Sequence, residues 1–276
     1  SDVLTIDASS LAANVTINAQ QQSRVLNFSA TSGDLTLSGL NVVNGYTTGE
    51  TERGAGIRFN SSGALTLTDS TVSGNKTTGN FAYGGGIYTN SGAVTLNGST
   101  VSGNSTTGSS ARAGGIHTNV GQVTLNSSTL SGNSTVGTLA AGGGIWTVSG
   151  AVTLIGSTVS DNSTMGSVAA GGGIRTQNGN ISLTNSTLSG NSTAGDNADG
   201  GGIRTSSGSV ALKDSTLSGN STTGSSAEGG GLWTYFGAVT LTSSTVSGNS
   251  SGSSGGAAFV YDSNNNPAFT IQNSIV

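Results

Sequence analysis

The sequence predicts an all-β, single-domain, right-handed parallel β-helix, or β-solenoid, with three short strands in each coil of about 29 residues and about nine coils. Three observations predict this fold: a recurring apolar marker, period-two alternation between the markers, and glycines that interrupt every segment. The markers each follow a glycine-rich run: Ile57, Ile87, Ile116, Ile145, Ile174, Ile203 and Leu232. The first two are 30 residues apart, and each later marker follows the one before it by 29 residues.

Each copy of the repeat contains three segments with strand periodicity. Residues 145–147, 152–154 and 158–160 alternate large apolar and polar side chains, as strands with one buried face do. Glycines at 142–144 and at Gly150 are too closely spaced for a helix. We expect each strand to stack on its counterpart in the next copy at about 4.8 Å, and the usual hand of parallel crossovers favours a right-handed winding.

Stacking turns each position of the repeat into a row along the body. Two inward rows belong to the middle strand: Val94, Val123, Val152, Ile181, Val210 and Val239, and Leu96, Leu125, Leu154, Leu183, Leu212 and Leu241. The last strand supplies a third: Val101, Leu130, Val159, Leu188, Leu217 and Val246. An asparagine row follows it, and we interpret it as a structural ladder of stacked amides: Asn75, Asn104, Asn133, Asn162, Asn191, Asn220 and Asn249.

The chain divides into three parts along this repeat. Residues 1–53 form irregular N-terminal coils, residues 54–249 carry the regular GGGI/STVSGN repeats, and residues 250–276 form a C-terminal coil that ends in mid-turn. The N-terminal part supplies a middle, a last and a first strand at 4–6, 15–17 and 25–28. Residues 269–276 align with residues 239–246.

The two ends of the predicted stack are complementary. Residues 269–271 form a middle strand, so the strand that stacks on them in a following coil must also be a middle strand. Residues 4–6 are such a strand. We therefore expect self-association end to end, because open strand edges add further strands. The residues that would stack are Leu4, Ile6, Val15, Ile17, Phe269, Ile271 and Ile275. The alternative is that residues 1 and 276 are boundaries within a longer protein.

Composition narrows the classes of function. Glycine accounts for 47 of 276 residues, charged residues for 7%, and the formal net charge is −4, which argues against nucleic acid as a partner. No run of 18 apolar residues predicts a transmembrane segment. The sequence has no cysteine, so we expect no thiolate metal site and no cysteine nucleophile. We expect no cofactor and no metal.

A row of aromatic and basic residues is the main candidate site. It occupies the position after each marker: Arg58, Tyr88, His117, Trp146, Arg175, Arg204 and Trp233. We expect this position to face outward, where the row would form an exposed binding stripe for a glycan or for a host or cell-surface protein. The alternative is a self-stacking ladder held by cation–π contacts.

Two further faces have alternative interpretations. Asp199 and Glu228, one coil apart and near Asp196, suggest an acid/base pair or a Ca²⁺ site of a polysaccharide-degrading β-helix, or else a variable turn. The variable turn is preferred because the corresponding positions in other coils hold Tyr83, Arg112, Ala141 and Ala170. The acidic cluster is also peripheral, so we expect no enzymatic activity. Thr-x-Ser rows such as Thr158 and Ser160 resemble the faces of ice-binding solenoids, although threonine and serine also suit any exposed strand.

The GGGI tetrapeptides at 84–87 and 142–145, and the spacing of Val101 to Asn104, resemble the repeats of polymorphic outer-membrane proteins, whose signatures are GGA[ILV] and FxxN. The STxSGN coils look equally like those of long bacterial extracellular β-helix proteins. The resemblance covers about residues 54 to 249 and implies a bacterial protein that is secreted or displayed at the cell surface. It also implies a surface adhesin or a fibre subunit.

Overall fold

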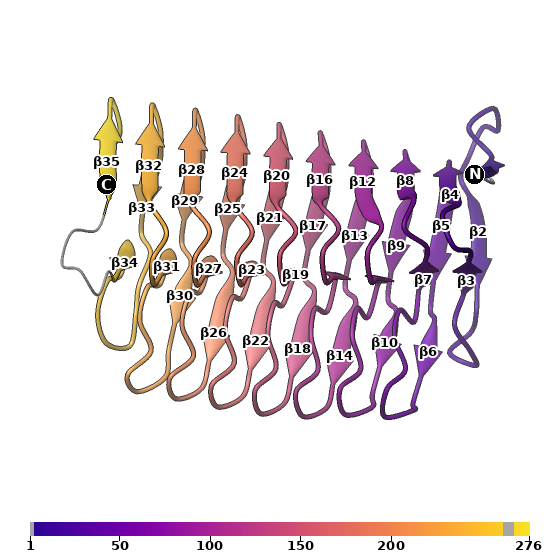
Figure 1. Ribbon diagram of the computed structural model, residues 1–276, viewed down its shortest axis with the longest axis horizontal. Helices are drawn as coiled ribbons and strands as arrows, with labels where there is room; N and C mark the ends of the chain where they lie inside the picture. The colour runs from indigo at the N-terminus through magenta and orange to yellow at the C-terminus, as the bar shows by residue number, and fades with distance from the viewer. Residues whose placement is uncertain (1–2, 262–267) are drawn as a thin grey trace.

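The computed structural model describes residues 3–261 and 268–276 and confirms the predicted β-solenoid. The coils stack along one long axis, with the first strands at one end of the body and the last strands at the other (Figure 1). Within the described residues the strands form four parallel sheets of nine, ten, nine and seven strands. We number them sheets 1 to 4 in the order in which a coil passes through them.

The strands have the following bounds in the described residues. Sheet 1 contains β3 (Leu26–Ser29), β7 (Ile57–Asn60), β11 (Ile87–Thr89), β15 (Ile116–Thr118), β19 (Ile145–Thr147), β23 (Ile174–Thr176), β27 (Ile203–Thr205), β31 (Leu232–Thr234) and β34 (Ala258–Val260). Sheet 2 contains β1 (Val3–Asp7), β4 (Asp34–Ser38), β8 (Ala64–Thr68), β12 (Ala93–Asn97), β16 (Val123–Asn126), β20 (Val152–Ile155), β24 (Ile181–Thr184), β28 (Val210–Lys213), β32 (Val239–Thr242) and β35 (Phe269–Gln272). Sheet 3 contains β2 (Val15–Asn18), β5 (Leu40–Val43), β9 (Thr71–Ser73), β13 (Thr100–Ser102), β17 (Thr129–Ser131), β21 (Thr158–Ser160), β25 (Thr187–Ser189), β29 (Thr216–Ser218) and β33 (Thr245–Ser247). Sheet 4 contains β6 (Tyr46–Thr47), β10 (Lys76–Thr77), β14 (Ser105–Thr107), β18 (Ser134–Val136), β22 (Ser163–Met165), β26 (Ser192–Ala194) and β30 (Ser221–Thr222).

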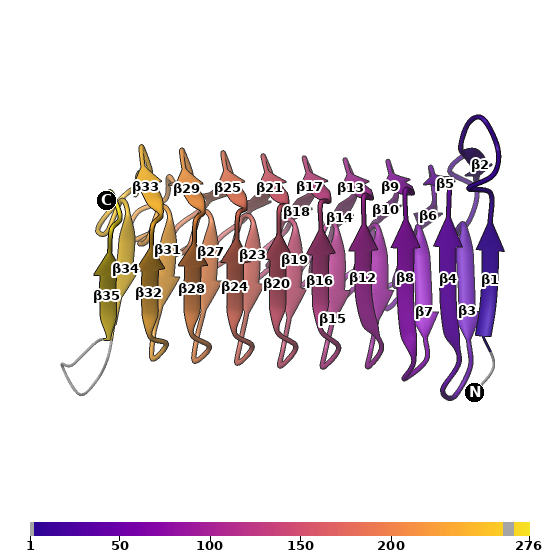
Figure 2. The ribbon, with the colours of Figure 1, turned by 90° about the horizontal axis from the view of Figure 1, so that it is seen from above.

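The core lies inside the coils and consists of the predicted inward rows. In sheet 2, Val123 pairs in register with Val152, and Leu125 pairs with Leu154. All four side chains are fully buried, and they belong to one continuous core cluster. The strands of sheet 2 lie side by side along the whole body (Figure 2). Each coil therefore buries its apolar face against its neighbours, as in other repeat folds.

Sheet 4 is the part of the coil that the sequence analysis did not predict. Its strands follow the asparagine row directly and have two or three residues each. In β14 the inward residue is Thr106, which is fully buried, whereas Ser105 and Thr107 are half-buried. Because the inward position holds a threonine rather than a large apolar residue, the alternation of hydrophobicity that marks the other strands is absent here.

The glycine run before each marker is a consequence of close approach between coils. Gly142 has φ +69°, a left-handed conformation that L side chains rarely adopt. A Cβ on Gly143 or Gly144 would meet the carbonyl oxygen of Gly172 or Gly173 in the next coil, at 2.4 Å and 2.6 Å respectively. Most coils therefore have glycine where the chain turns from sheet 4 into sheet 1, and alanine replaces it at Ala55 and Ala113.

The irregular ends follow the same register. At the N-terminal end, β1 pairs with β4, β2 with β5 and β3 with β7, which confirms the predicted middle, last and first strands. At the C-terminal end, β35 pairs with β32, so that Phe269 lies opposite Val239 as aligned. Among the described residues, no helix has the length and apolar character needed to cross a membrane.

Candidate functional site

The predicted binding stripe is largely buried, so the expectation that it is exposed was wrong. Its members, which we call the inner row, pair in register on sheet 1: His117 lies opposite Trp146, and Trp146 lies opposite Arg175. His117 is fully buried, and Trp146 is 3% exposed. Tyr88 and Trp233 are also buried, whereas Arg58, Arg175 and Arg204 are half-buried.

The inner row is covered by a second row of residues from the turn that precedes the glycines. We call this set the outer row: Arg53, Tyr83, Arg112, Ala141, Ala170, Asp199 and Glu228. Each large outer residue of the first three coils contacts the inner residue of the next coil: Arg53 contacts Tyr88, Tyr83 contacts His117, and Arg112 contacts Trp146. The turn therefore folds over the strand, which removes Tyr88, His117 and Trp146 from solvent.

The first half of the two rows is a stack of rings around His117. The centroid of its ring lies 4.7 Å from that of Tyr83, 5.3 Å from that of Tyr88 and 5.0 Å from that of Trp146. The planes of the histidine and Tyr83 differ by 7°. These contacts match the alternative interpretation of a self-stacking ladder. Whether the row also binds a ligand stays a prediction.

Two arginines complete this stack. The Arg53 guanidinium lies 5.0 Å from the ring centroid of Tyr83 and 5.1 Å from that of Tyr88, and its Nη1 donates a hydrogen bond of 2.6 Å to the Tyr88 hydroxyl. The Arg112 guanidinium lies 5.2 Å from the ring centroid of Tyr83 and 4.3 Å from that of Trp146. These distances are typical of cation–π contacts.

His117 is neutral in this environment. Burial lowers its pKa well below the ordinary value of 6.5, and the positive charges of Arg112 and Arg53 lower it further. Neither ring nitrogen has a hydrogen-bond partner among the described residues. His117 therefore stabilises the stack as a flat ring, and no base or carboxylate orients it for proton transfer in the part of the chain that the structure describes.

The predicted acidic pair is engaged by its own neighbours. Asp199 Oδ2 lies 3.8 Å from Arg204 Nε, and Asp199 Oδ1 accepts a hydrogen bond from the Glu228 backbone N–H at 3.1 Å. Burial raises the pKa of Asp199, although this hydrogen bond and the charges of Arg204 and Arg175 lower it. Glu228 Oε2 accepts a hydrogen bond of 3.4 Å from Trp233 Nε1. Both carboxylates thus cover the second half of the inner row.

An exposed aromatic cluster beside Trp233 was not identified from the sequence. The ring centroid of Tyr235 lies 6.0 Å from that of Trp233, 4.3 Å from that of Phe236 and 4.6 Å from that of Tyr261. Tyr235 is 37% exposed, Phe236 is 53% exposed and Tyr261 is 42% exposed. Exposed aromatic groups of this kind suit contacts with sugars or proteins. Tyr235 and Phe236 lie in one coil and Tyr261 lies in the next. Their contact depends on the conformations of the two turns, which an alignment of the repeats does not show.

The asparagine row forms the expected ladder. Asn162 Nδ2 donates to Asn191 Oδ1 at 2.9 Å, while Asn162 Oδ1 accepts from the backbone N–H of Asn133 at 3.0 Å and from its Nδ2 at 2.9 Å. Asn162 Nδ2 also donates to the Leu130 carbonyl in the preceding coil at 3.0 Å. Corresponding amide contacts extend from Asn75 to Asn249. The amides therefore satisfy the backbone at the corner between sheets 3 and 4.

The residues predicted for end-to-end stacking lie at the two ends of the body. Leu4, Val15, Phe269, Ile271 and Ile275 are between 38% and 69% exposed. Ile6 and Ile17 are half-buried and pack against the core. These positions agree with the predicted strand order, and self-association itself stays a prediction.

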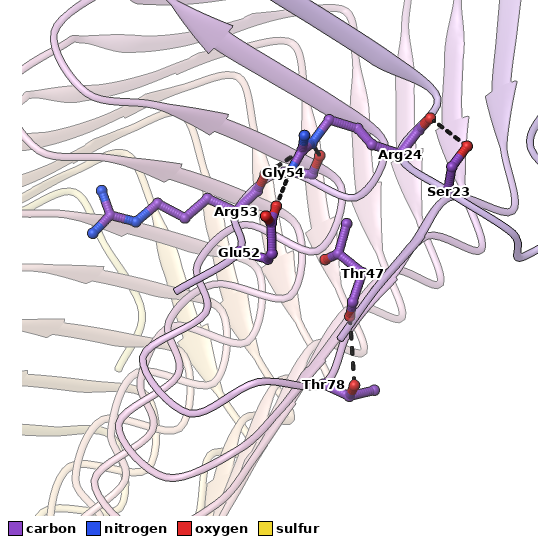
Figure 3. Close-up of polar contacts among 7 residues, drawn as sticks. All are labelled: Ser23, Arg24, Thr47, Glu52, Arg53, Gly54 and Thr78. Atoms are coloured by element: carbon purple, nitrogen blue, oxygen red, sulfur yellow. Dashed lines mark hydrogen bonds and ion pairs between the residues drawn. The ribbon is translucent and has the colours of Figure 1, made fainter. Parts of the chain in front are cut away.

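The turn between β6 and β7 carries three charged residues, Glu50, Glu52 and Arg53. An ion pair joins Arg24 to Glu52, and Arg24 Nε donates to the carbonyls of Arg53 and Gly54 at 3.2 Å and 3.0 Å (Figure 3). The Arg53 side chain extends away from this pair. Arg24 therefore fixes the backbone of the turn, and Arg53 is left to cover Tyr88.

Sheet 3 carries the Thr-x-Ser rows in register. Thr129 lies opposite Thr158, and Ser131 lies opposite Ser160. All four side chains are half-buried on the outer face, because the residue between each pair points inward. We call these rows the hydroxyl lattice.

Comparison of the chain with protein-family models, with curated proteins and with solved structures found no match.

Proposed function

We propose that this chain is a non-enzymatic structural and adhesive β-solenoid of an extracellular bacterial surface, either an adhesin or a fibre subunit. The observation that carries the proposal is the unbroken register of the rows over the regular coils, seen in the continuous amide ladder from Asn75 to Asn249. Such a stack makes a long body with the same outer surface in coil after coil, which suits a spacer or a multivalent contact. The extracellular location draws support from the GGGI and Val-x-x-Asn motifs.

The adhesive part of the proposal draws on the exposed aromatic cluster of Tyr235, Phe236 and Tyr261. Aromatic side chains at a surface are frequent in contacts with glycans and proteins, because they offer a large apolar area with few rotatable bonds. The inner row is no longer the preferred surface for such contacts, since its aromatic members are buried.

Adhesion assays test this proposal. Beads coated with the chain are allowed to settle on immobilised acidic and neutral polysaccharides and on cultured cells, and the same polysaccharides are assayed for newly formed reducing ends. We expect retention of the beads without product, and weaker retention for the Tyr235→Ser/Phe236→Ser variant. Equal retention of beads coated with an unrelated protein would contradict adhesion, and product formation would contradict a non-enzymatic role.

The fibre part of the proposal has its own test. Electron microscopy of the chain at high concentration is expected to reveal linear assemblies if the exposed edges of β1 and β35 stack. Strictly single particles at every concentration would remove end-to-end stacking from the proposal.

A second candidate function is ice binding through the hydroxyl lattice. The observation that favours it is the strict register of the threonine and serine rows on sheet 3. Neighbouring rows of such a sheet repeat at about 4.8 Å along the body. Thermal hysteresis at millimolar protein, abolished in the Thr129→Lys/Thr158→Lys variant, is the expected result, and its absence from the parent chain excludes this function.

A further inference from the structure

A groove of about 290 Å³ opens on the turn side of the solenoid, where the coils that contain β15, β19 and β23 meet. Trp146, Arg112 and Arg175 contribute to its walls, together with Gln177. The groove is large enough for a small organic ligand of about ten non-hydrogen atoms, near the lower limit of ordinary ligand sites.

The groove exists because the outer row changes to alanine at two consecutive coils. The outer positions of the first three coils hold large side chains, such as Tyr83, which lies over His117 in the next coil. Ala141 and Ala170 occupy the same position, pair in register with each other, and carry only a methyl group. Arg175 is the inner residue that a large side chain at position 141 would cover.

The positive charge at this groove is not compensated. Among the described residues, no carboxylate lies within ion-pair distance of Arg112 or Arg175, whereas the neighbouring Arg204 has Asp199 at 3.8 Å. Burial, together with the charges of Arg204 and Arg112, lowers the pKa of Arg175 to about 9, while Asp199 raises it. Even a half-buried cation loses part of its hydration, and without an anion nearby this loss is not offset, so an anionic ligand would be stabilised here.

The rim of the groove is apolar in the same two coils. Leu139 is 53% exposed, and Val168 is 47% exposed. Both residues have left-handed backbone conformations, with φ values of 62° and 61°. The equivalent positions in adjacent coils hold the polar residues Ser110 and Asn197. The same conformation recurs at this turn from Phe81 to Ser226, so what is unusual at Val168 is a β-branched residue where a left-handed backbone disfavours one.

We propose that this groove binds a small organic carboxylate with an apolar body, of the class of aryl- or alkyl-substituted acetic acids. The guanidinium groups of Arg175 and Arg112 donate hydrogen bonds to the carboxylate oxygens, as planar guanidinium forks commonly do. The apolar body lies against Leu139 and Val168. The site is independent of the proposed adhesive role, since it uses neither the aromatic cluster nor the hydroxyl lattice.

Nuclear magnetic resonance of the two tryptophan indoles tests the proposal, because the chain contains only Trp146 and Trp233. The Trp233→Phe variant assigns the two indole N–H signals. Phenylacetate is titrated against the intact chain, with acetate, neutral 2-phenylethanol and glucuronate as comparison compounds. We expect phenylacetate to shift the Trp146 signal in a saturable way, and each comparison compound to bind at least tenfold more weakly.

Each comparison compound can overturn one part of the proposal. Equal binding of acetate would show that the apolar contact contributes nothing to affinity. Equal binding of 2-phenylethanol would show that the groove does not recognise the negative charge. Equal or tighter binding of glucuronate would show that the groove accepts a sugar acid rather than a carboxylate with an apolar body. If phenylacetate causes no saturable shift up to about 50 mM, the groove is not a site for this class.

Two variants and a matched control locate the binding. Ala141→Tyr places over Arg175 the residue type that already lies over His117, and it should close the groove and weaken phenylacetate binding at least tenfold. Arg175→Gln should do the same by removing charge, whereas Arg204→Gln, one coil away and already paired with Asp199, should bind like the parent chain. Circular dichroism establishes that each variant is folded. Parent-like binding by folded Ala141→Tyr overturns the proposal, even if Arg175→Gln does not fold.

Discussion

The asparagine ladder and the inner row are both continuous stacks along the solenoid, yet they differ in how completely their polar groups are satisfied. Each interior asparagine repeats the same set of hydrogen bonds to neighbouring coils, as at Asn133 and Asn162. The inner row changes residue type from coil to coil, and His117 and Trp146 keep buried nitrogens without partners among the described residues. A repeated asparagine can bond to its own copies in the adjacent coils, whereas the varied side chains of the inner row cannot, and this leaves buried polar groups free for other contacts.

The largest effect is expected at the centre of the asparagine ladder. Asn162→Ala leaves the Asn133 backbone N–H and the Leu130 carbonyl without the side-chain partner that Asn162 supplies, whereas Asn191 Oδ1 keeps the backbone N–H of position 162. Because each unsatisfied buried group costs about 1–3 kcal/mol, we expect the free energy of unfolding to fall by about 4 kcal/mol. Urea denaturation measures this change. Asn249→Ala, at a half-buried end of the ladder, is the matched control and should lose less than half as much.

A smaller loss is expected in the inner row. Trp146→Ala removes a ring that contacts both His117 and Arg112, and it leaves a cavity where a buried side chain was. We expect a loss of about 3 kcal/mol in the free energy of unfolding, at the lower end of the range for truncating a buried tryptophan. Trp146→Phe keeps an aromatic ring and should lose less than about 1.5 kcal/mol. Equal losses for both variants would contradict stabilisation by ring stacking, because Trp146→Phe keeps an aromatic ring at this position.

The neutral state of His117 predicts a pH dependence that the asparagine ladder cannot have. Since the folded-state pKa of His117 lies below 6.5, the unfolded chain binds a proton below that pH that the native chain does not. The free energy of unfolding should therefore fall as pH decreases below 6.5, by up to about 1.4 kcal/mol per pH unit. His117→Tyr should lack this slope between pH 6.5 and 5.5. A parallel slope in the two proteins would assign the effect to other groups.

The smallest effect is expected at the rim of the groove, and it has the opposite sign. Val168→Asn replaces a strained valine with a residue that tolerates the left-handed conformation, as Asn197 does one coil later. The free energy of unfolding should rise by about 1 kcal/mol. In the reciprocal variant Asn197→Val, the free energy of unfolding should fall by a similar amount. A loss of stability in Val168→Asn would contradict the assignment of strain to this position.

The same difference between uniform and variable rows explains what could be predicted from the sequence. The register, the three main strands and the asparagine ladder follow from residues that recur at one interval, such as Leu125 and Leu154. The fourth strand was missed because its inward residue is a threonine such as Thr106. Hydrophobic periodicity cannot detect a strand whose buried side is polar.

The burial of the inner row was missed for a different reason. Tyr83 and His117 are 34 residues apart, which is neither the period of the repeat nor a spacing within one strand. The contact depends on a turn folding over the following coil, and turn conformations of this kind have no repeating hydrophobic signal. The groove was missed because it arises from side chains that Ala141 and Ala170 lack, which sequence alignment registers only as variation in a turn.

The consecutive alanines of the outer row have a consequence for how such a chain changes in evolution. Each coil contacts mainly its two neighbours, so recombination between copies adds or removes one period without disturbing the register of the rest. Duplication of residues 141–169 would place a third small residue beside Ala141 and Ala170, and would lengthen the groove by about 4.8 Å. Recombination within one gene would then change the length of ligand that the groove accommodates, with no new side chain required.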